Sequence, residues 1–441
     1  MKETLERLAQ LIRALGVRSG PQSGPASGTR STVETLVLDS VFFFYDDLGG
    51  MNLGGRDVEE YRGCVEALYA QVAGKEQVSR SAIETYVQRA VLTAIDPKGS
   101  RSETDFETRL GSVIEKLKDE LKAKPILWEV HFQVEGLDTK ALPVTFGGCE
   151  FYCVNDAYLA KLVQRTNSVI ASLVEGPSRE QAKRLNADEM RKLDGRTGVS
   201  TMVLAVDFRA AQAAAEKQVR LTVDMLNFYA NLGNQPLTQL IFLDGVKPGV
   251  AEGFMFSEAP PSMRTNLARV GPMVPFSFKA EFEAAGLSRV STLLLKPNRS
   301  VLEDKILSAL QWAGRASVEQ RKGEAFLLFA IALEALVMSG NDKAEITEKL
   351  AIRTAHLVIK NPKSRVQAYK DLKTLYGIRS KIVHSGSEDV TGDDLARIRF
   401  FVQRALLTVL CTAPFSKMAD EAEFVAWVHN CMLGAAQVPE A

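Results

Sequence analysis

The chain has 441 residues, of which 46% are hydrophobic and 24% are charged, and its 54 Lys and Arg balance its 54 Asp and Glu. This length exceeds what one hydrophobic core usually supports, so we expect at least two domains, and the composition excludes a disordered or fibrous chain. The zero net charge also excludes a protein that binds nucleic acid through an overall basic surface, so any such site must be local.

The first 34 residues combine a helical pattern with a linker. Apolar residues recur at helical spacing in MKETLERLAQLIRALGV, at Leu5, Leu8, Leu11, Ile12 and Leu15, which predicts an amphipathic helix. The following SGPQSGPASGTRST is rich in Ser, Gly and Pro and predicts a flexible connector. We therefore expect the helix to be tethered loosely or to dock on a partner. Its glutamates and interrupted apolar run argue against a signal or transit peptide.

Residues 35–297 mix strand and helix patterns. A strand is predicted in TLVLDSVFFFYDDLGG, three helices between residues 57 and 121, and further strands in ILWEVHFQVEGL, LPVTFGGCEFYCV and TMVLAVDFRA. The helix AAQAAAEKQVRLTVDMLNFYANL and the strands QLIFLDG and GFMFSE complete the region. We assign these residues to a mixed α/β domain whose role, sensing or target selection, the sequence leaves open.

From residue 298 onward the strand patterns end. The predicted helices are SVLEDKILSALQWAGRA, KGEAFLLFAIALEALVM, AEITEKLAIRTAHLVI, RVQAYKDLKTLYGIRSKIVH, DDLARIRFFVQRALLTVL and DEAEFVAWVHNCML. Short connectors with Gly, Asn, Pro or Asp separate them, which is typical of a helical bundle. The whole chain is therefore expected to be α+β, with a mixed α/β N-terminal region followed by an all-α domain at residues 298–441.

Cysteine usage and hydropathy bear on the compartment. The five cysteines are scattered along the chain, which favours a reducing compartment over a disulfide framework. The longest apolar helical run, AFLLFAIALEALVM, has 14 residues and includes Glu334, so it is too short to span a bilayer. We therefore expect a cytoplasmic protein with no membrane partner.

The signatures of common nucleotide-binding and hydrolytic enzymes are missing from the sequence. It contains no Walker loop, no dinucleotide-binding GxGxxG, no HExxH and no serine elbow. Cys149 and Cys153 are four residues apart but have no histidine or acidic partner at zinc spacing. We therefore expect neither a cofactor nor a metal site.

The segment from Asp342 to Lys381 carries a local positive charge, with ten Lys and Arg against four Asp and Glu. Such a run is either a solvated face or an anion-binding site. It leads into LYGIRSKIVHSG, where Gly386 is a natural helix C-cap that would place His384 in the last turn. A histidine exchanges protons near neutral pH, as general acid–base catalysis requires. Arg379 offers a cationic fork that suits a phosphate.

Arg379 and His384 thus suit phosphodiester chemistry, but their spacing separates them by about 140° on an ideal helix. Both can reach one substrate if the arginine curls round the helix, if the helix end unwinds, or if two chains meet. The third arrangement predicts a symmetric dimer with a composite cleft. Glu334 stands inside the apolar run LLFAIALEALV, and we expect it to face a cation or a cleft because unpaired burial of an acid is costly.

Three blocks of the C-terminal region carry a family resemblance. FLLFAIALEALV, EITEKLAIRTAHLV and LYGIRSKIVHSG occur in this order and resemble the HEPN superfamily, most closely its Apea-like branch. The hallmark of that family is an arginine, commonly followed by a polar residue, with a histidine beyond four to six further residues. Arg379, Ser380 and His384 match this pattern. The resemblance covers residues 300–430 and leaves the preceding part of the chain without a family.

The resemblance implies a helical bundle that dimerises. Many family members are metal-independent ribonucleases in phage defence, toxin systems or RNA processing. For this chain it implies that His384 handles protons while a ribose 2′-hydroxyl attacks the adjacent phosphate, and that Arg379 stabilises the transition state. Glu334 would complete the catalytic set by orienting Arg379 or its dimer mate. The expected RNA-binding residues are Ser380, Lys381 and Tyr376.

The expected partners are RNA, a second copy of the chain through the C-terminal domain, and a protein or phage-derived trigger at the N-terminal region. Three alternatives stay open. The C-terminal domain binds RNA or a nucleotide without cutting it, it is a protein-interaction bundle paired with an effector, or it serves nucleotide-transfer chemistry with a partner enzyme. For Glu334 the alternative is that it lies on the solvent-exposed edge of its helix or forms a purely structural ion pair.

Overall fold

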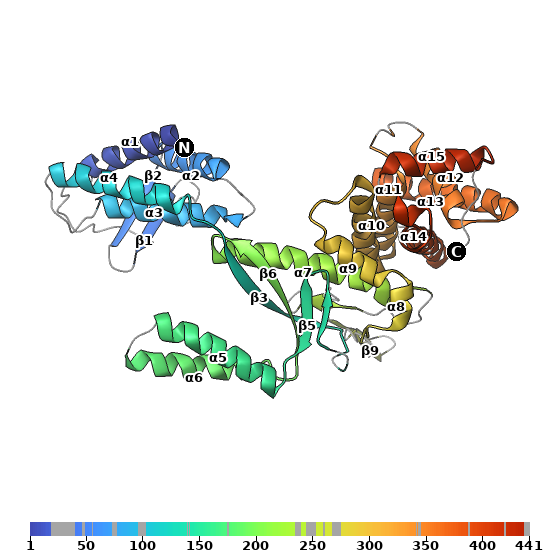
Figure 1. The fold of residues 1–441 in the computed structure, drawn as a ribbon, viewed down its shortest axis with the longest axis horizontal. Helices are drawn as coiled ribbons and strands as arrows, with labels where there is room; N and C mark the ends of the chain where they lie inside the picture. Colours follow the sequence, from blue (N-terminus) through green and yellow to red (C-terminus); the bar gives the residue numbers. More distant parts are fainter. Residues whose placement is uncertain are drawn as a thin grey trace. The chain divides into compact units, whose positions relative to one another are not determined.

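The structure, a computed structural model, describes residues 1–18, 40–45, 49–54, 56–72, 77–95, 103–138, 140, 142–173, 176–233, 240–243, 253–258, 261–266, 275–340, 342, 345–386, 389–418 and 420–435. The connector expected before residue 35 falls outside these residues. The architecture is α+β, as expected, with one five-stranded antiparallel sheet and an all-helical C-terminal region (Figure 1).

The elements follow one another along the chain with the following bounds. In the first half they are α1 (Lys2–Arg18), β1 (Ser40–Tyr45), β2 (Gly49–Gly54), α2 (Arg56–Gln71), α3 (Arg80–Ile95), α4 (Glu103–Glu120), β3 (Ile126–Glu135), β4 (Val144–Phe146), β5 (Cys149–Cys153), α5 (Asp156–Leu173), α6 (Pro177–Arg191), β6 (Thr197–Ala205) and α7 (Phe208–Ala230). In the second half they are β7 (Phe242–Leu243), β8 (Gly253–Glu258), β9 (Pro261–Asn266), α8 (Ala280–Ala284), α9 (Leu287–Leu295), α10 (Val301–Val318), α11 (Lys322–Val337), α12 (Ile346–Val358), α13 (Pro362–Ser385), α14 (Gly392–Cys411), a short 3-10 turn (Phe415–Lys417) and α15 (Glu421–Met432).

The chain folds as two compact units. The first consists of Met1–Val130 with Met202–Glu216, and the second of His131–Thr201 with Lys217–Ala441. These bounds differ from the divisions expected at residues 34 and 297. The second unit takes in all helices from α8 onward together with part of the mixed region, because one apolar core runs from Phe151 and Val199 of the sheet to Leu406 of α14.

The first unit is a cluster of helices with a β1–β2 hairpin. Leu8 and Ile12 of α1 are fully buried together with Tyr61 and Leu68 of α2 and Val91 of α3. The expectation of a loosely tethered first helix is therefore wrong, since its apolar stripe packs against its neighbours in the sequence. The hairpin strands pair antiparallel, and β1 lies within TLVLDSVFFFYDDLGG, the segment in which a strand was predicted.

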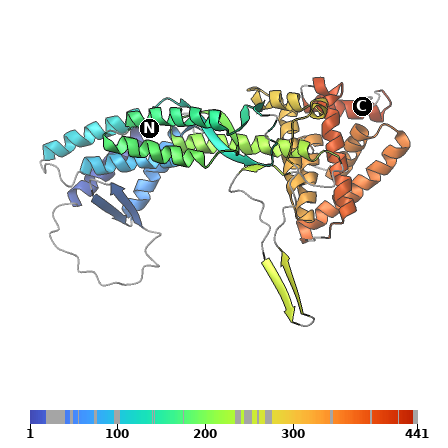
Figure 2. The same cartoon turned by 90° about the horizontal axis from the view of Figure 1, so that it is seen from below.

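The five-stranded sheet has the strand order β4-β5-β6-β3-β7. The second unit holds β4, β5 and β7 together with residues 131–135 of β3 and 197–201 of β6. Strands β5 and β6 are antiparallel neighbours, with Phe151 opposite Val199. The residues that join them form two helices, α5 and α6, which pack on each other as a hairpin (Figure 1). No residue between 155 and 196 whose exposure the structure describes is buried. Tyr158 of α5 nevertheless stacks on the buried Tyr152 of β5, with the ring centres 4.1 Å apart. Strands β8 and β9 form a separate two-stranded ribbon (Figure 2).

The six expected C-terminal helices all form, as α10 to α15. Their apolar faces pack together in a core that includes Leu310, Phe326, Leu333, Leu375 and Leu406. α10 packs against α11, α11 against α14, and α12 against α13 (Figure 1). Among the described helices, none is both long enough and apolar enough to cross a membrane.

Helix α10 also crosses α7 at a point of very close approach. A Cβ at Gly314 would lie 1.7 Å from the carbonyl oxygen of Asp224, so this position has room for glycine alone. The Asp224 carboxylate accepts hydrogen bonds from Arg315 Nε at 2.8 Å and Gln311 Nε2 at 3.2 Å. Burial raises the pKa of Asp224 although Arg315 acts in the opposite direction. The crossing therefore combines steric fit with an ion pair whose carboxylate is mostly buried and whose guanidinium is partly exposed.

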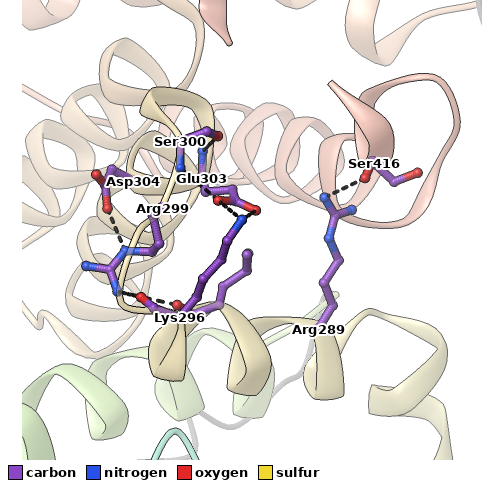
Figure 3. Close-up of polar contacts among 8 residues, drawn as sticks. Arg289, Lys296, Arg299, Ser300, Glu303, Asp304 and Ser416 are labelled. Carbon is purple, nitrogen blue, oxygen red and sulfur yellow. Dashed lines mark hydrogen bonds and ion pairs between the residues drawn. The ribbon is translucent and has the colours of Figure 1, made fainter. Parts of the chain in front are cut away.

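Helix α9 is fixed to the far end of α14 by one arginine. The Arg289 guanidinium donates to the carbonyl oxygen of Ser416 at 3.0 Å and to that of Leu410 (Figure 3). Burial lowers the pKa of Arg289. Because the last carbonyls of a helix lack partners within the helix, the arginine both satisfies them and completes the end of α14.

The start of α10 is determined by local capping. Ser300 accepts from the Glu303 amide at 3.2 Å, and Glu303 accepts from the Ser300 amide at 2.8 Å. Lys296 adds an ion pair to Glu303 at 2.7 Å (Figure 3). This is a capping box, which satisfies two unpaired donors at once, and it explains why α10 begins close to residue 298. The helices α8 and α9 precede α10, so the helical region begins earlier than predicted.

Candidate functional site

The candidate residues lie on α13 and on the facing helix α11. Asn361 caps the start of α13 by accepting from the amides of Lys363 and Ser364, and Pro362 occupies the first turn. The helix ends at Gly386, whose φ of 64° is the left-handed value that favours glycine. The predicted C-cap is therefore confirmed. α13 stays helical through Ser385, so Arg379 and His384 belong to one uninterrupted helix.

Arg379 is paired with Glu334, as expected for that acid. Arg379 Nε lies 3.0 Å from Glu334 Oε1, and the two side chains are 27% and 26% exposed. Such partial burial makes the pair stronger than a fully solvated one, because solvent screens it less. The arginine therefore points from α13 toward α11, with solvent still able to reach it.

Tyr376 lies beneath this ion pair. The guanidinium carbon of Arg379 is 5.8 Å from the centre of the Tyr376 ring, within the range of a cation–π contact. The tyrosine is buried, and its hydroxyl makes no hydrogen bond of ordinary geometry with any described residue. Burial, and then the negative charge of Glu334, raise the pKa of Tyr376. Direct contact with RNA, expected for Tyr376, is not open to this buried ring; the ring instead supports Arg379.

His384, Ser380 and Lys381 form the solvent-facing part of the candidate set. All three are exposed. Their side chains make no hydrogen bond or ion pair with any of the residues that the structure describes. The structure thus brings Glu334, Arg379 and Tyr376 together and leaves His384 on another side of the same helix, about 140° from Arg379.

The other three histidines have different surroundings. His356 Nδ1 lies 2.9 Å from the Ile352 carbonyl oxygen, and burial lowers the pKa of His356. His131 Nδ1 lies 2.7 Å from the Tyr152 hydroxyl. His429 is exposed in the last turn of α15, but Phe424 stands where His384 has an arginine five residues before it. His384 is therefore the histidine that combines exposure with a nearby cation on its helix.

A second polar network, which the sequence analysis missed, joins the ends of α11 and α12. The buried Arg353 donates to Asp342 and to the Val337 carbonyl oxygen at 2.9 Å. Burial alone would raise the pKa of Asp342, but Arg353, the Ser339 amide and Lys349 outweigh it and lower the pKa to about 2. The signal in the sequence was Arg353 among apolar residues in EITEKLAIRTAHLV. Its pairing closes the loop after α11, which is a structural role.

Two hollows are separate from the candidate residues, and no cluster of metal-ligating side chains is found among the described residues. One hollow of about 470 Å³ is lined by Arg404 and Cys411, and another of the same volume by Tyr229 and Phe276. Neither is lined by a candidate residue. Within the described ranges no group of three or more His, Cys, Asp or Glu is arranged to hold a metal. The candidate residues therefore lie on a surface of α13 and α11, outside these two hollows.

Comparison with known proteins identifies no related family, protein or structure. No family model, no curated protein and no solved structure matches the chain significantly. The likeness to HEPN proteins consequently depends on the three sequence blocks and the Arg379–His384 spacing.

Proposed function

We propose that the chain is a HEPN-type, metal-independent endoribonuclease that acts through Arg379 and His384 at a composite site between two copies. One observation supports this above the others. An arginine held in place by Glu334 and an exposed histidine without a partner among the described residues occupy the last turns of one regular helix. These are the groups that phosphodiester cleavage needs, a fixed cation and a free acid–base.

The reaction follows from the roles of these groups. His384 accepts the proton of the ribose 2′-hydroxyl, whose oxygen attacks the adjacent phosphorus. The bond from phosphorus to the 5′-oxygen breaks, and that oxygen takes up a proton. Arg379 stabilises the extra negative charge on the phosphate oxygens. The products are a 2′,3′-cyclic phosphate and a 5′-hydroxyl, so a chain without 2′-hydroxyls is not cleaved.

Glu334 is assigned the role of positioning Arg379, and a second copy supplies the partner group. The cellular setting of the resemblance, phage defence or a toxin system in the cytoplasm with a trigger sensed by the N-terminal region, is part of the same proposal. The alternative is a module that binds RNA or a nucleotide without cutting it, or a protein-interaction bundle. The pairing of Arg379 within its own chain favours that alternative, since a paired arginine is partly neutralised.

Incubation of the full-length protein with total RNA in EDTA tests the proposal. The variants are His384→Ala and Arg379→Ala, and His429→Ala is the matched control because it removes an exposed histidine from the last turn of another helix. We expect cleavage by the wild type and by His429→Ala, and a loss of about 100-fold or more in the other two. Glu334→Gln should lose activity less severely, since it retains a hydrogen-bond acceptor for Arg379.

Folding and oligomeric state are checked for each variant by circular dichroism and by mass. Activity that survives in both His384→Ala and Arg379→Ala would show that another site cleaves. RNA binding without cleavage in the wild type would support the non-catalytic alternative, and neither activity would support the interaction bundle.

A further inference from the structure

One face of α13 is lined by cations. Lys363, Val366, Lys370, Thr374, Gly377, Lys381 and His384 are spaced three or four residues apart and are all exposed. At 100° per residue they fall within an arc of about 80° and extend over about 32 Å of helix. We call this set the lysine face. It contains no Asp or Glu, and Arg379 lies on the opposite side.

The lysines of this face are free to bind an anion. Lys363, Lys370 and Lys381 form no ion pair with any residue in the described part of the chain. By contrast Lys373, at the flank of the face, pairs with Glu348 at 2.9 Å. A row of unpaired cations without interspersed acids repels itself, and a polyanion relieves that repulsion.

The packing of the described residues does not require a glycine at Gly377, in the middle of the lysine face. A Cβ at this position would meet no described atom within 4 Å. Glycine inside a helix costs stability relative to alanine, so the residue is unfavourable for the helix itself. A side chain missing at the centre of a cationic face allows an extended ligand to lie close to the helix backbone.

The charge pattern favours a nucleic-acid strand over a second copy along the whole face. A symmetric contact of this face with its own copy would bring the unpaired Lys363, Lys370 and Lys381 of one chain toward those of the other, with no Asp or Glu on the face to pair with them. Such like-charge pairs disfavour association. A sugar–phosphate backbone meets the same residues with opposite charge, and Lys381 lies only about one turn from His384.

We propose that the lysine face binds the phosphate backbone of single-stranded RNA and leads it to His384. This inference rests on the proposed ribonuclease function and specifies how its substrate is held. No aromatic side chain lies on the face to stack with bases, so the contacts are with phosphates and carry no sequence information. Base preference, where there is any, then comes from other parts of the molecule.

Binding of a short, single-stranded, 2′-O-methylated RNA to the full-length protein tests this, because that RNA cannot be cleaved by 2′-hydroxyl attack. Fluorescence anisotropy gives Kd over about 50–200 mM salt. The test variant is Lys363→Gln/Lys370→Gln/Lys381→Gln. The matched control is Lys161→Gln/Lys217→Gln/Lys322→Gln, which changes charge equally at three exposed lysines away from the face.

For the test variant we expect Kd to rise by about tenfold or more at low salt, and the slope of log K against log salt to become shallower by about 2. The control should bind like the wild type. Equal loss in both variants, no loss in the test variant, or no binding by the wild type overturns the proposal. A change of oligomeric mass in the test variant also overturns it, because the face would then be a protein interface. Wild type that binds through this face but does not cut natural RNA refutes the nuclease and leaves the binding surface standing.

Discussion

Two glycines inside helices of the same unit, Gly314 of α10 and Gly377 of α13, should respond in opposite directions to substitution by alanine. Gly314→Ala adds a methyl group at the crossing of α10 and α7. Gly377→Ala adds the same group on the exposed lysine face. Both positions lie within helices, so the gain in helix propensity is the same and the surroundings decide the net effect.

The structure determines the size of each effect. The added carbon at Gly314 would stand 1.7 Å from the Asp224 carbonyl oxygen, so α7 and α10 would have to separate by about 1.5 Å or more to reach ordinary contact. Overpacking of this kind costs about 1–3 kcal/mol or more, against a propensity gain of about 1 kcal/mol. At Gly377 no described atom lies within 4 Å of the new carbon. We therefore expect a net loss of about 2 kcal/mol for Gly314→Ala and a gain of about 0.5–1 kcal/mol for Gly377→Ala.

Differential scanning calorimetry of the full chain measures both. For a unit of this size 1 kcal/mol corresponds to about 2 °C in Tm, so Gly377→Ala should raise the transition of the second unit slightly and Gly314→Ala should lower it by about 4 °C. The transition of the first unit should not move. A Gly314→Ala protein as stable as the wild type would refute the close crossing of α7 and α10. A Gly377→Ala protein that is destabilised would refute the open surroundings of the lysine face.

Two further predictions concern the second unit. Asp342→Asn should destabilise the protein by about 2 kcal/mol at neutral pH. The pKa of this carboxyl falls from an ordinary 3.8 to about 2 in the fold, so its stabilising effect is present above pH 4 and is lost as the pH falls toward 2. The free energy of unfolding measured with urea between pH 2 and pH 5 should therefore depend less on pH in the variant than in the wild type. Replacing residues 155–195 by Asn-Gly joins Val154 to Arg196 through a two-residue turn; the Val154 amide already donates to the Arg196 carbonyl oxygen at 2.9 Å. Because the deletion also removes Tyr158, which stacks on Tyr152, the rest of the unit should melt within about 4 °C of the wild type. A chain that fails to fold would mean that the α5–α6 hairpin supports the core.

The helical C-terminal region could be predicted because local rules agree there. Apolar residues recur at helical spacing, and the ends carry caps such as Ser300 with Glu303 and the glycine at Gly386. Each signal involves residues a few positions apart, so neighbouring sequence suffices. The strand at residues 126–135 was likewise indicated by its β-branched and aromatic residues. The strand predicted in TMVLAVDFRA also forms, but it begins and ends earlier, at residues 197–205.

Some helices were not predicted from the sequence, and the extent of one strand was not predicted correctly. No element was predicted for residues 155–196, where α5 and α6 form, although DAYLAKLVQRTNSVIASL places apolar residues at helical spacing and left α5 open to prediction. The helix α9 has the sequence LSRVSTLLL, whose apolar run reads equally as a strand. Of the described residues 240–243 in the strand predicted at QLIFLDG, Phe242 and Leu243 pair with β3; the remaining residues of that segment lie outside the described ranges.

The contacts of the candidate site could be predicted where a charged group inside an apolar run needs a partner. Glu334 inside an apolar run needed a cation, and Arg379 supplies it. Tyr376 could not be assigned correctly from spacing alone, because a tyrosine one turn before an arginine can face solvent or the core with equal regularity. The lysine face was open to prediction, since Lys363, Lys370 and Lys381 repeat at intervals that keep them on one side of a helix.

The geometry of α13 narrows how Arg379 and His384 can act together. The helix does not unwind before Gly386, so its end does not carry His384 round to the arginine. For Arg379 to curl toward His384 it would have to leave Glu334 and the Tyr376 ring, which costs both contacts. A second copy that brings its own histidine to the α11 side of α13 breaks neither contact, and Glu334 then holds the arginine still while the other chain supplies the acid–base group. For this reason, under the proposed function, the composite arrangement is the one in which the observed ion pair would assist catalysis instead of opposing it.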